Sequence, residues 1–97
     1  MKAPAQHQRI HARVSGAVQG VFYRVFAAGA GSRLGLTGVV RNLADGAVEV
    51  IAEGTRTELD TFIGLLEKGP PAATVESVAV ERERATGEYD GFDIDVG

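Results

Sequence analysis

The sequence predicts an α+β fold in which two helices pack on one face of a mainly antiparallel sheet. Three observations support this prediction. Short stretches in which apolar and polar residues alternate are typical of half-buried strands. Two stretches with helical spacing of apolar residues lie between them. The order along the chain is strand, helix, strand, strand, helix, strand, followed by one short strand.

The first third of the chain predicts a strand, a loop and a helix. Residues 9–15 alternate between apolar and polar side chains, as a half-buried strand does. The glycine-flanked residues 16–20 interrupt this pattern and predict a short loop. Apolar residues then recur every four positions over residues 22–34, which predicts a helix. Gly35 is expected to end this helix, because glycine tolerates the left-handed conformation that follows many helices.

The middle of the chain predicts a β-hairpin. Residues 37–42 contain a β-branched run, and residues 47–53 alternate. Asp45 and Gly46 lie between them, and an Asp-Gly pair between two such runs is a strong hairpin signal.

A second helix begins with a capping box formed by Thr55 and Glu58, and the prolines of residues 69–71 end it. Two more strands are predicted over residues 75–82 and 92–96. The resulting order, βαββαβ plus a short C-terminal strand, predicts a ferredoxin-like α/β sandwich. Residues 9–97 are expected to form a single domain after a flexible N-terminal tail of residues 1–8.

Composition excludes several classes of function. The 97 residues contain no cysteine, which removes disulfides, thiolate metal sites and thiol nucleophiles. The net charge of −3, with acids and bases interspersed, lacks the basic face that nucleic-acid binding needs. No apolar run approaches the roughly 20 residues of a membrane span. The polar start has no signal-peptide pattern, so we expect a cytoplasmic protein with no membrane partner.

Two stretches carry the candidate site. The loop from Gly16 to Gly20 runs directly into a helix, so its main-chain amides and the positive end of the helix dipole favour an anion. Arg24, in the first helical turn, can form a bidentate contact with phosphate. Asn42 comes just before the hairpin turn and can donate to and accept from a water. The residue types alone also fit a tight turn, an exposed Arg24 and a turn-capping Asn42.

The combination of these residues resembles the acylphosphatase signature. The resemblance runs over nearly the whole chain, from residue 9 to residue 97. Its matched segments are residues 16–24 (GAVQGVFYR), 34–50 (LGLTGVVRNLADGAVEV), 69–75 (GPPAATV) and 92–94 (FDI).

The resemblance implies a small monomeric hydrolase that acts on acyl phosphates without metal or cofactor, releasing a carboxylate and inorganic phosphate. It implies that Arg24 binds the substrate phosphate and that Asn42 orients the attacking water. The main-chain amides that would share the phosphate are those of Gly16, Ala17, Val18, Gln19, Gly20 and Val21.

The sequence departs from the family pattern at a few positions. Ala17 stands where a basic residue is frequent, and Val39 where tryptophan is frequent. Gly31 replaces a usual alanine in the first helix, and together with Gly29 it is expected to lower stability by about 1 kcal/mol per glycine. Phe22 and Tyr23 are expected to pack at the start of that helix rather than to stack on a ligand.

The chemistry suits so small a site. A carboxylate leaving group, whose acid has a pKa of about 4, departs without a general acid. The loose transition state of phosphoryl transfer depends on positioning and charge stabilisation, which Arg24, the amides and Asn42 would supply. The substrate's own phosphate oxygen is then the proposed proton acceptor. Carbamoyl phosphate, acetyl phosphate, 1,3-bisphosphoglycerate and aspartyl phosphates are all candidate substrates.

Three other functions remain open. A non-catalytic module of the same fold would bind phosphate without hydrolysing it. An RNA-recognition domain shares the element order, but residues 47–53 lack the aromatic side chains that stack on bases. The third is an acylphosphatase-like domain of a larger carbamoyl-handling protein. A start at Met1 and an end at the last strand favour a free-standing protein.

Overall fold

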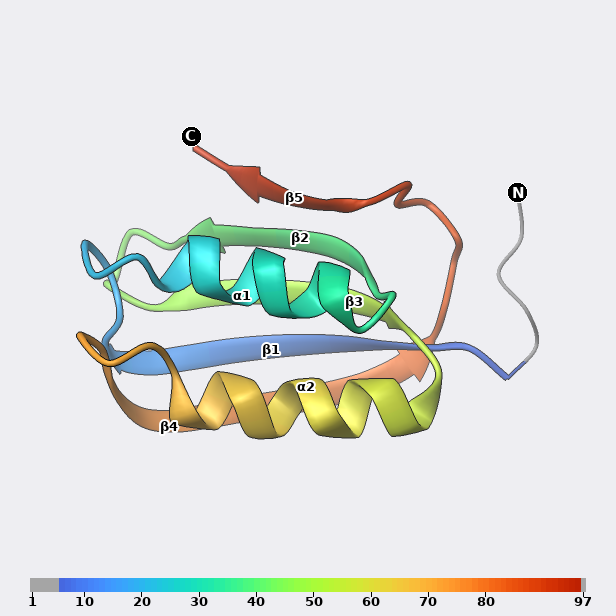
Figure 1. Ribbon diagram of the computed structural model, residues 1–97, viewed down its shortest axis with the longest axis horizontal. Helices are drawn as coiled ribbons and strands as arrows, with labels where there is room; N and C mark the ends of the chain where they lie inside the picture. Colours follow the sequence, from blue (N-terminus) through green and yellow to red (C-terminus); the bar gives the residue numbers. More distant parts are fainter. Residues whose placement is uncertain (1–5, 97) are drawn as a thin grey trace.

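The protein folds as the predicted ferredoxin-like sandwich (Figure 1). The computed structural model describes residues 6–96, so residues 1–5 of the predicted tail lie outside the described residues, and Gln8 belongs to the first strand. The elements are β1 (Gln8–Ala17), α1 (Tyr23–Arg33), β2 (Thr37–Asn42), β3 (Val48–Gly54), α2 (Arg56–Lys68), β4 (Thr74–Arg84) and β5 (Phe92–Asp95).

The sheet determines which chain segments can meet. Its strand order is β4-β1-β3-β2-β5, and every neighbouring pair is antiparallel except β2 and β5. Because β1 and β2 are both antiparallel to β3, they run in the same direction, and β5 runs parallel to β2. The carboxyl ends of β1, β2 and β5 therefore lie at one edge of the sheet.

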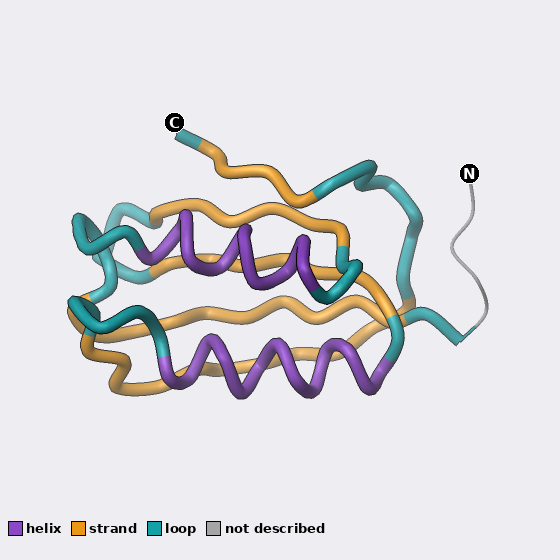
Figure 2. Tube along the Cα trace, viewed as in Figure 1, coloured by secondary structure: helices purple, strands orange, loops and turns teal. Residues whose placement is uncertain are grey.

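Both helices cover the same face of the sheet (Figure 2). In Figure 1, α1 lies on the side of β2 and β5, and α2 on the side of β1 and β4. Inward-facing residues of the strands alternate with outward-facing ones and form one core with the helices. The largest fully buried side chains of this core are Tyr23, Phe62, Ile10, Leu59, Leu66, Val14, Val18, Val40, Val48 and Val50. Among residues 6–96, no helix is long and apolar enough to cross a membrane.

The capping box of α2 is confirmed. The Thr55 hydroxyl accepts a hydrogen bond from the Glu58 amide at 3.2 Å, and the Glu58 carboxylate accepts one from the Thr55 amide at 3.2 Å. The helix ends at Gly69, whose φ of 68° is left-handed. The sequence-based boundaries of this helix are therefore correct.

The boundary between β1 and the following loop differs from the prediction. Gly16 and Ala17 do not belong to the loop but continue β1, where they pair with Val75 and Thr74 of β4 after a register shift. A Cβ at residue 16 would lie 2.2 Å from the Thr74 oxygen, so only glycine fits there. Gly16 breaks the sequence pattern because of this close approach, and the loop begins at Val18.

Gly31 allows β5 to pack against α1. A Cβ at this position would lie 2.5 Å from ring atoms of Phe92, the first residue of β5. The Phe92 ring also packs edge-on against Phe62 of α2, with 5.6 Å between the ring centroids. Gly31 is thus more than the weak point we expected, because its missing side chain leaves room for the aromatic anchor of β5.

Candidate active site

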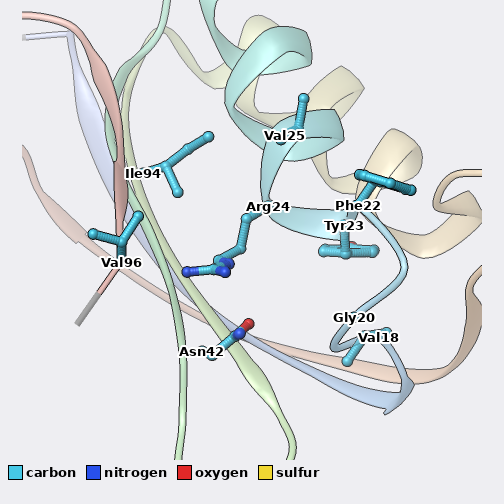
Figure 3. A pocket seen from close by; sticks show the side chains of 9 residues that line it. All are labelled: Val18, Gly20, Phe22, Tyr23, Arg24, Val25, Asn42, Ile94 and Val96. Carbon is cyan, nitrogen blue, oxygen red and sulfur yellow. The ribbon is translucent and has the colours of Figure 1, made fainter.

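The strand directions bring the predicted site residues together at one edge of the sheet. The loop after β1, the last residue of β2 and the end of β5 surround a pocket of about 440 Å³. Figure 3 shows the Arg24 and Asn42 side chains pointing into this pocket from α1 and β2. The lining residues are Val18, Gly20, Phe22, Tyr23, Arg24, Val25, Asn42, Ile94 and Val96.

Arg24 enters the pocket from the first turn of α1. Its side chain is half-buried, and Nη1 donates a hydrogen bond to the main-chain oxygen of Asp95 at 2.8 Å. That bond fixes the guanidinium and leaves its other donors available. Arg24 forms no ion pair with any residue between 6 and 96, whereas Arg9 and Arg82 each have a carboxylate partner. A fixed, half-buried positive charge without a counterion favours an anionic ligand.

Asn42 ends β2 and faces the helices. Val40, two residues earlier on the same face, is fully buried in the core. The Oδ1 atom of Asn42 is buried and accepts no hydrogen bond from the described residues. A buried acceptor without a partner is costly, so this oxygen is suited to a water or ligand hydrogen.

The loop conformation and the start of α1 favour an anion at the same place. Gly20 has a φ of 75° and Phe22 a φ of 65°, so two left-handed residues lie within three positions. Successive amides in such a turn can point toward one spot and attract an anion. No side chain caps α1, and its first turn contains no acid. The first amides of this helix are therefore free of side-chain acceptors, unlike those of α2.

Gln19 connects the loop to the hairpin turn beside Asn42. Its Nε2 donates to the main-chain oxygens of Leu43 at 2.8 Å and Ala47 at 2.9 Å. From the sequence, only the main-chain amide of Gln19 was expected to belong to the site. The side chain holds the loop against the residue that follows Asn42, and only the three-dimensional contact identifies this.

Phe22 and Tyr23 behave differently, although both were expected to pack at the start of the helix. The Tyr23 side chain is 1% exposed, and its hydroxyl donates to the main-chain oxygen of Leu66 at 2.6 Å. That oxygen lacks its helical donor, because Pro70 has no amide. Phe22 is 79% exposed, so the prediction for its ring is wrong. Its backbone is left-handed, the ring lies outside the core, and the residue lines the pocket.

A buried carboxylate holds the segment that leads into β5. Glu53 accepts hydrogen bonds from the amides of Thr86 and Gly87, both at 2.9 Å, and from Arg9 Nε at 2.7 Å. Burial by itself would raise the pKa of Glu53, but these hydrogen bonds from the two amides and from Arg9 hold it below its usual value. The fixed connection helps to place β5 as one wall of the pocket.

The six residues predicted for the phosphate-binding loop take different positions in the structure. Val18 and Gly20 line the pocket with Arg24 and Asn42. Val21 packs against the core, and Gly16 and Ala17 pair with β4. Within residues 6–96, no group of three or more His, Asp or Glu side chains is gathered so as to hold a metal ion.

Comparison with known proteins agrees with this architecture. The acylphosphatase family model matches residues 10–94. An acylphosphatase of Methylococcus capsulatus is 47% identical over 85 residues, covering 88% of this chain and 92% of that protein. The acylphosphatase structure from Bacillus subtilis superimposes with a TM-score of 0.88 at 32% identity, covering 91% of this chain and 98% of that one. The acylphosphatase structure from Coxiella burnetii gives 0.86 at 39% identity, covering 93% and 94%.

The five-stranded sheet with both helices on one face places the protein in the class of ferredoxin-like α/β sandwiches. Within that class, the chain belongs to the acylphosphatase family. Family membership makes it a hydrolase of the acylphosphatase type.

Proposed function

We propose that the protein hydrolyses the carboxyl–phosphate anhydride of acyl phosphates at the pocket between α1, β2 and β5. One observation carries the proposal. Arg24 has a guanidinium without an ion-pair partner among the described residues, and it shares the pocket with the unpartnered Oδ1 of Asn42. An anion and a water are the two ligands that these groups need.

The phosphate binds to the Arg24 guanidinium, the amides of the loop residues 18–21 and the free first turn of α1. Its charge is met by the guanidinium and by the helix dipole. The hydrogen bond from Arg24 to the Asp95 oxygen fixes the side chain before substrate arrives. Little reorganisation is then needed as the transition state forms.

Asn42 Oδ1 accepts a hydrogen bond from the attacking water and so directs the water oxygen toward the phosphorus atom. The water attacks phosphorus, the bond to the carboxylate oxygen breaks, and the electron pair leaves with the carboxylate. A phosphate oxygen of the substrate takes the water's proton, so the products are carboxylate and inorganic phosphate. The loose character of the transition state makes this positioning the main catalytic contribution.

The test is hydrolysis of benzoyl phosphate in the presence of a chelator. We expect full turnover, because the proposed groups all belong to the chain. Absence of turnover with and without added divalent cations would contradict the proposal, and rescue by a metal would contradict the proposed metal independence. The same sample on a sizing column should elute as a monomer, since all site residues come from one chain. The cytoplasmic location stays a prediction.

A second test separates catalysis from simple anion binding. Asn42→Ala should lower kcat by about 100-fold or more and leave competitive inhibition by inorganic phosphate nearly unchanged. Gln8→Ala is the matched control, because its Oε1 is another buried amide oxygen without a partner, outside this pocket. Equal loss of kcat in both variants would show that Asn42 acts through stability alone. Phosphate binding without any turnover in the unsubstituted protein would favour the non-catalytic module.

A further inference from the structure

The mouth of the pocket is apolar and exposed. Large hydrophobic side chains scattered singly over a surface are ordinary, but a group of them around one pocket marks a ligand site. Among residues 6–96, the exposed large hydrophobic side chains are Phe22 (79%), Val25 (60%), Ile94 (36%) and Val96 (84%). All four line the pocket that contains Arg24 and Asn42 (Figure 3).

These side chains form two facing walls. Phe22 is the left-handed residue that precedes α1, Val25 lies in its first turn, and both line the pocket. Ile94 and Val96 alternate with the acids of the last strand and therefore point to the same side of the sheet. Figure 3 shows Arg24 between the two walls, with its guanidinium below them.

The left-handed backbone of Phe22 has an energetic cost that burial of its ring does not offset. A bulky residue at a φ of 65° is a backbone outlier, and such residues cost about 1–3 kcal/mol and cluster at functional sites. The ring gains little burial in return, because 79% of the residue remains exposed. A ligand that covers the ring would offset this cost.

The charges at the pocket exclude a second anionic group on the ligand. Arg24 is the only charged side chain that lines the pocket in the described part of the chain, and the phosphate already uses it. Arg41, the residue before Asn42 on β2, does not line the pocket, and its Nε lies 3.4 Å from a Glu49 carboxylate oxygen and 3.5 Å from one of Asp95. A carboxylate or second phosphate on the acyl chain would meet an apolar wall without a cation.

We infer that the preferred substrates are acyl phosphates whose acyl group is an aromatic ring or a branched hydrocarbon, held between Phe22 and Val25 on one side and Ile94 and Val96 on the other. The inference rests on the proposed function, since it places the phosphate at Arg24. Small polar acyl groups and acyl chains with a second charge are poorer substrates of this site.

The experiment compares kcat/KM for isovaleryl phosphate and acetyl phosphate, whose leaving carboxylates have nearly the same basicity. A fully buried methylene contributes about a fourfold gain. The walls stay partly exposed, so the three additional carbons should give a ratio of about tenfold in favour of isovaleryl phosphate. A ratio near one would overturn the inference. So would faster hydrolysis of an acyl phosphate that carries a second phosphate group.

Two variants test whether the apolar walls cause the difference in kcat/KM between the two substrates. Phe22→Asn removes the ring and keeps a residue that tolerates positive φ. The ratio of kcat/KM for isovaleryl phosphate to that for acetyl phosphate should then fall at least about threefold, which corresponds to the loss of about one methylene contact. Val25→Thr changes the polarity of the side chain and nearly keeps its shape. It tests the apolar wall even if the substitution at residue 22 alters the loop. Val39→Thr is the matched control, because Val39 does not line the pocket and the variant should keep the unsubstituted ratio. An unchanged ratio in both Phe22→Asn and Val25→Thr would overturn the inference.

The proposed function and the apolar acyl preference are contradicted by different results. If no acyl phosphate is hydrolysed faster than by the Asn42→Ala variant, the proposed function fails and the inference with it. If both substrates are hydrolysed at similar kcat/KM, the proposed function stands and only the apolar acyl preference is wrong.

Discussion

The two helices of the sandwich begin in opposite ways. The first turn of α2 is closed by the reciprocal hydrogen bonds of Thr55 and Glu58. α1 begins at a left-handed Phe22, with no side-chain cap and no acid in its first turn. The difference separates two tasks that a helix N-terminus can perform. A capped terminus stabilises its own helix, whereas an uncapped one leaves its amides and dipole for a ligand.

The helices also differ in what they bury. α2 shows an apolar stripe formed by Leu59, Phe62 and Leu66, which makes it recognisable in the sequence. α1 buries mainly alanine and glycine, and its exposed apolar side chains, Phe22 and Val25, lie at the pocket. Because α1 packs against β2, β5 and α2 together, small residues are needed along much of its surface.

The largest expected effect comes from replacing the first-turn arginine of α1, with the first-turn arginine of α2 as the control. Arg24→Ala should lower kcat/KM for benzoyl phosphate by at least about 100-fold and abolish competitive inhibition by inorganic phosphate. Arg56→Ala is the control in α2, where the arginine is exposed and lies 3.8 Å from Asp60. Steady-state kinetics on both variants tests the comparison. Similar kinetics for the two would contradict the role of the uncapped terminus.

Tyr23→Phe should be the most destabilising of the remaining changes. The carbonyl of Leu66 would lose its hydroxyl donor, and Pro70 supplies no amide in its place, so we expect a loss of about 2 kcal/mol in the free energy of unfolding. Urea denaturation measures it. Tyr89→Phe, in which the ring near Arg9 is kept, is the control. A loss below about 0.5 kcal/mol would mean that the contact adds little.

The same contact predicts a pH dependence. Burial raises the pKa of the Tyr23 hydroxyl in the folded protein. Above the ordinary tyrosine pKa of about 10, the unfolded chain releases this proton while the folded chain retains it, so stability falls as pH rises. Urea midpoints at increasing alkaline pH should decline less steeply for Tyr23→Phe than for the unsubstituted protein. Parallel declines would contradict the assignment.

Thr55→Ala should cost about 1 kcal/mol of stability and leave kcat/KM unchanged. Its hydroxyl accepts from the Glu58 amide, and the variant leaves that amide without a cap. Thermal unfolding and a benzoyl phosphate assay measure the two quantities. Thr57→Ala is the control, because Thr57 lies two residues further along the chain and is exposed. Loss of activity at full stability would show that α2 also contributes to the site.

The smallest effects come from the two glycines of α1, and they should have opposite signs. Gly29→Ala should stabilise by at most about 1 kcal/mol, because its Cβ would meet only Arg33 Nη1 at 3.4 Å. Gly31→Ala should not, because its Cβ would overlap the Phe92 ring. Denaturant midpoints of the two variants give the comparison. A gain of similar size in both would show that β5 adapts without cost.

Sequence patterns predicted most of the fold correctly. The capping box of Thr55 and the alternation of residues 9–15 depend on local geometry, which short segments largely determine by themselves. The end of β1 was misplaced because Gly16 signals both a loop and a close approach between strands. Phe22 was expected to pack at the start of the helix, but its left-handed backbone conformation, which a sequence pattern does not indicate, leaves it 79% exposed.

The sequence by itself determined the element order, the family resemblance and the residue types of the site, because these depend on local patterns. Only the tertiary structure decided that Arg24 is fixed by the Asp95 carbonyl, that Gln19 holds the loop to the hairpin turn, and that β5 supplies a wall of the pocket. These contacts join residues 24 to 71 positions apart. Nothing local encodes such pairs, because they exist only once the parallel directions of β1, β2 and β5 bring their ends to one edge of the sheet.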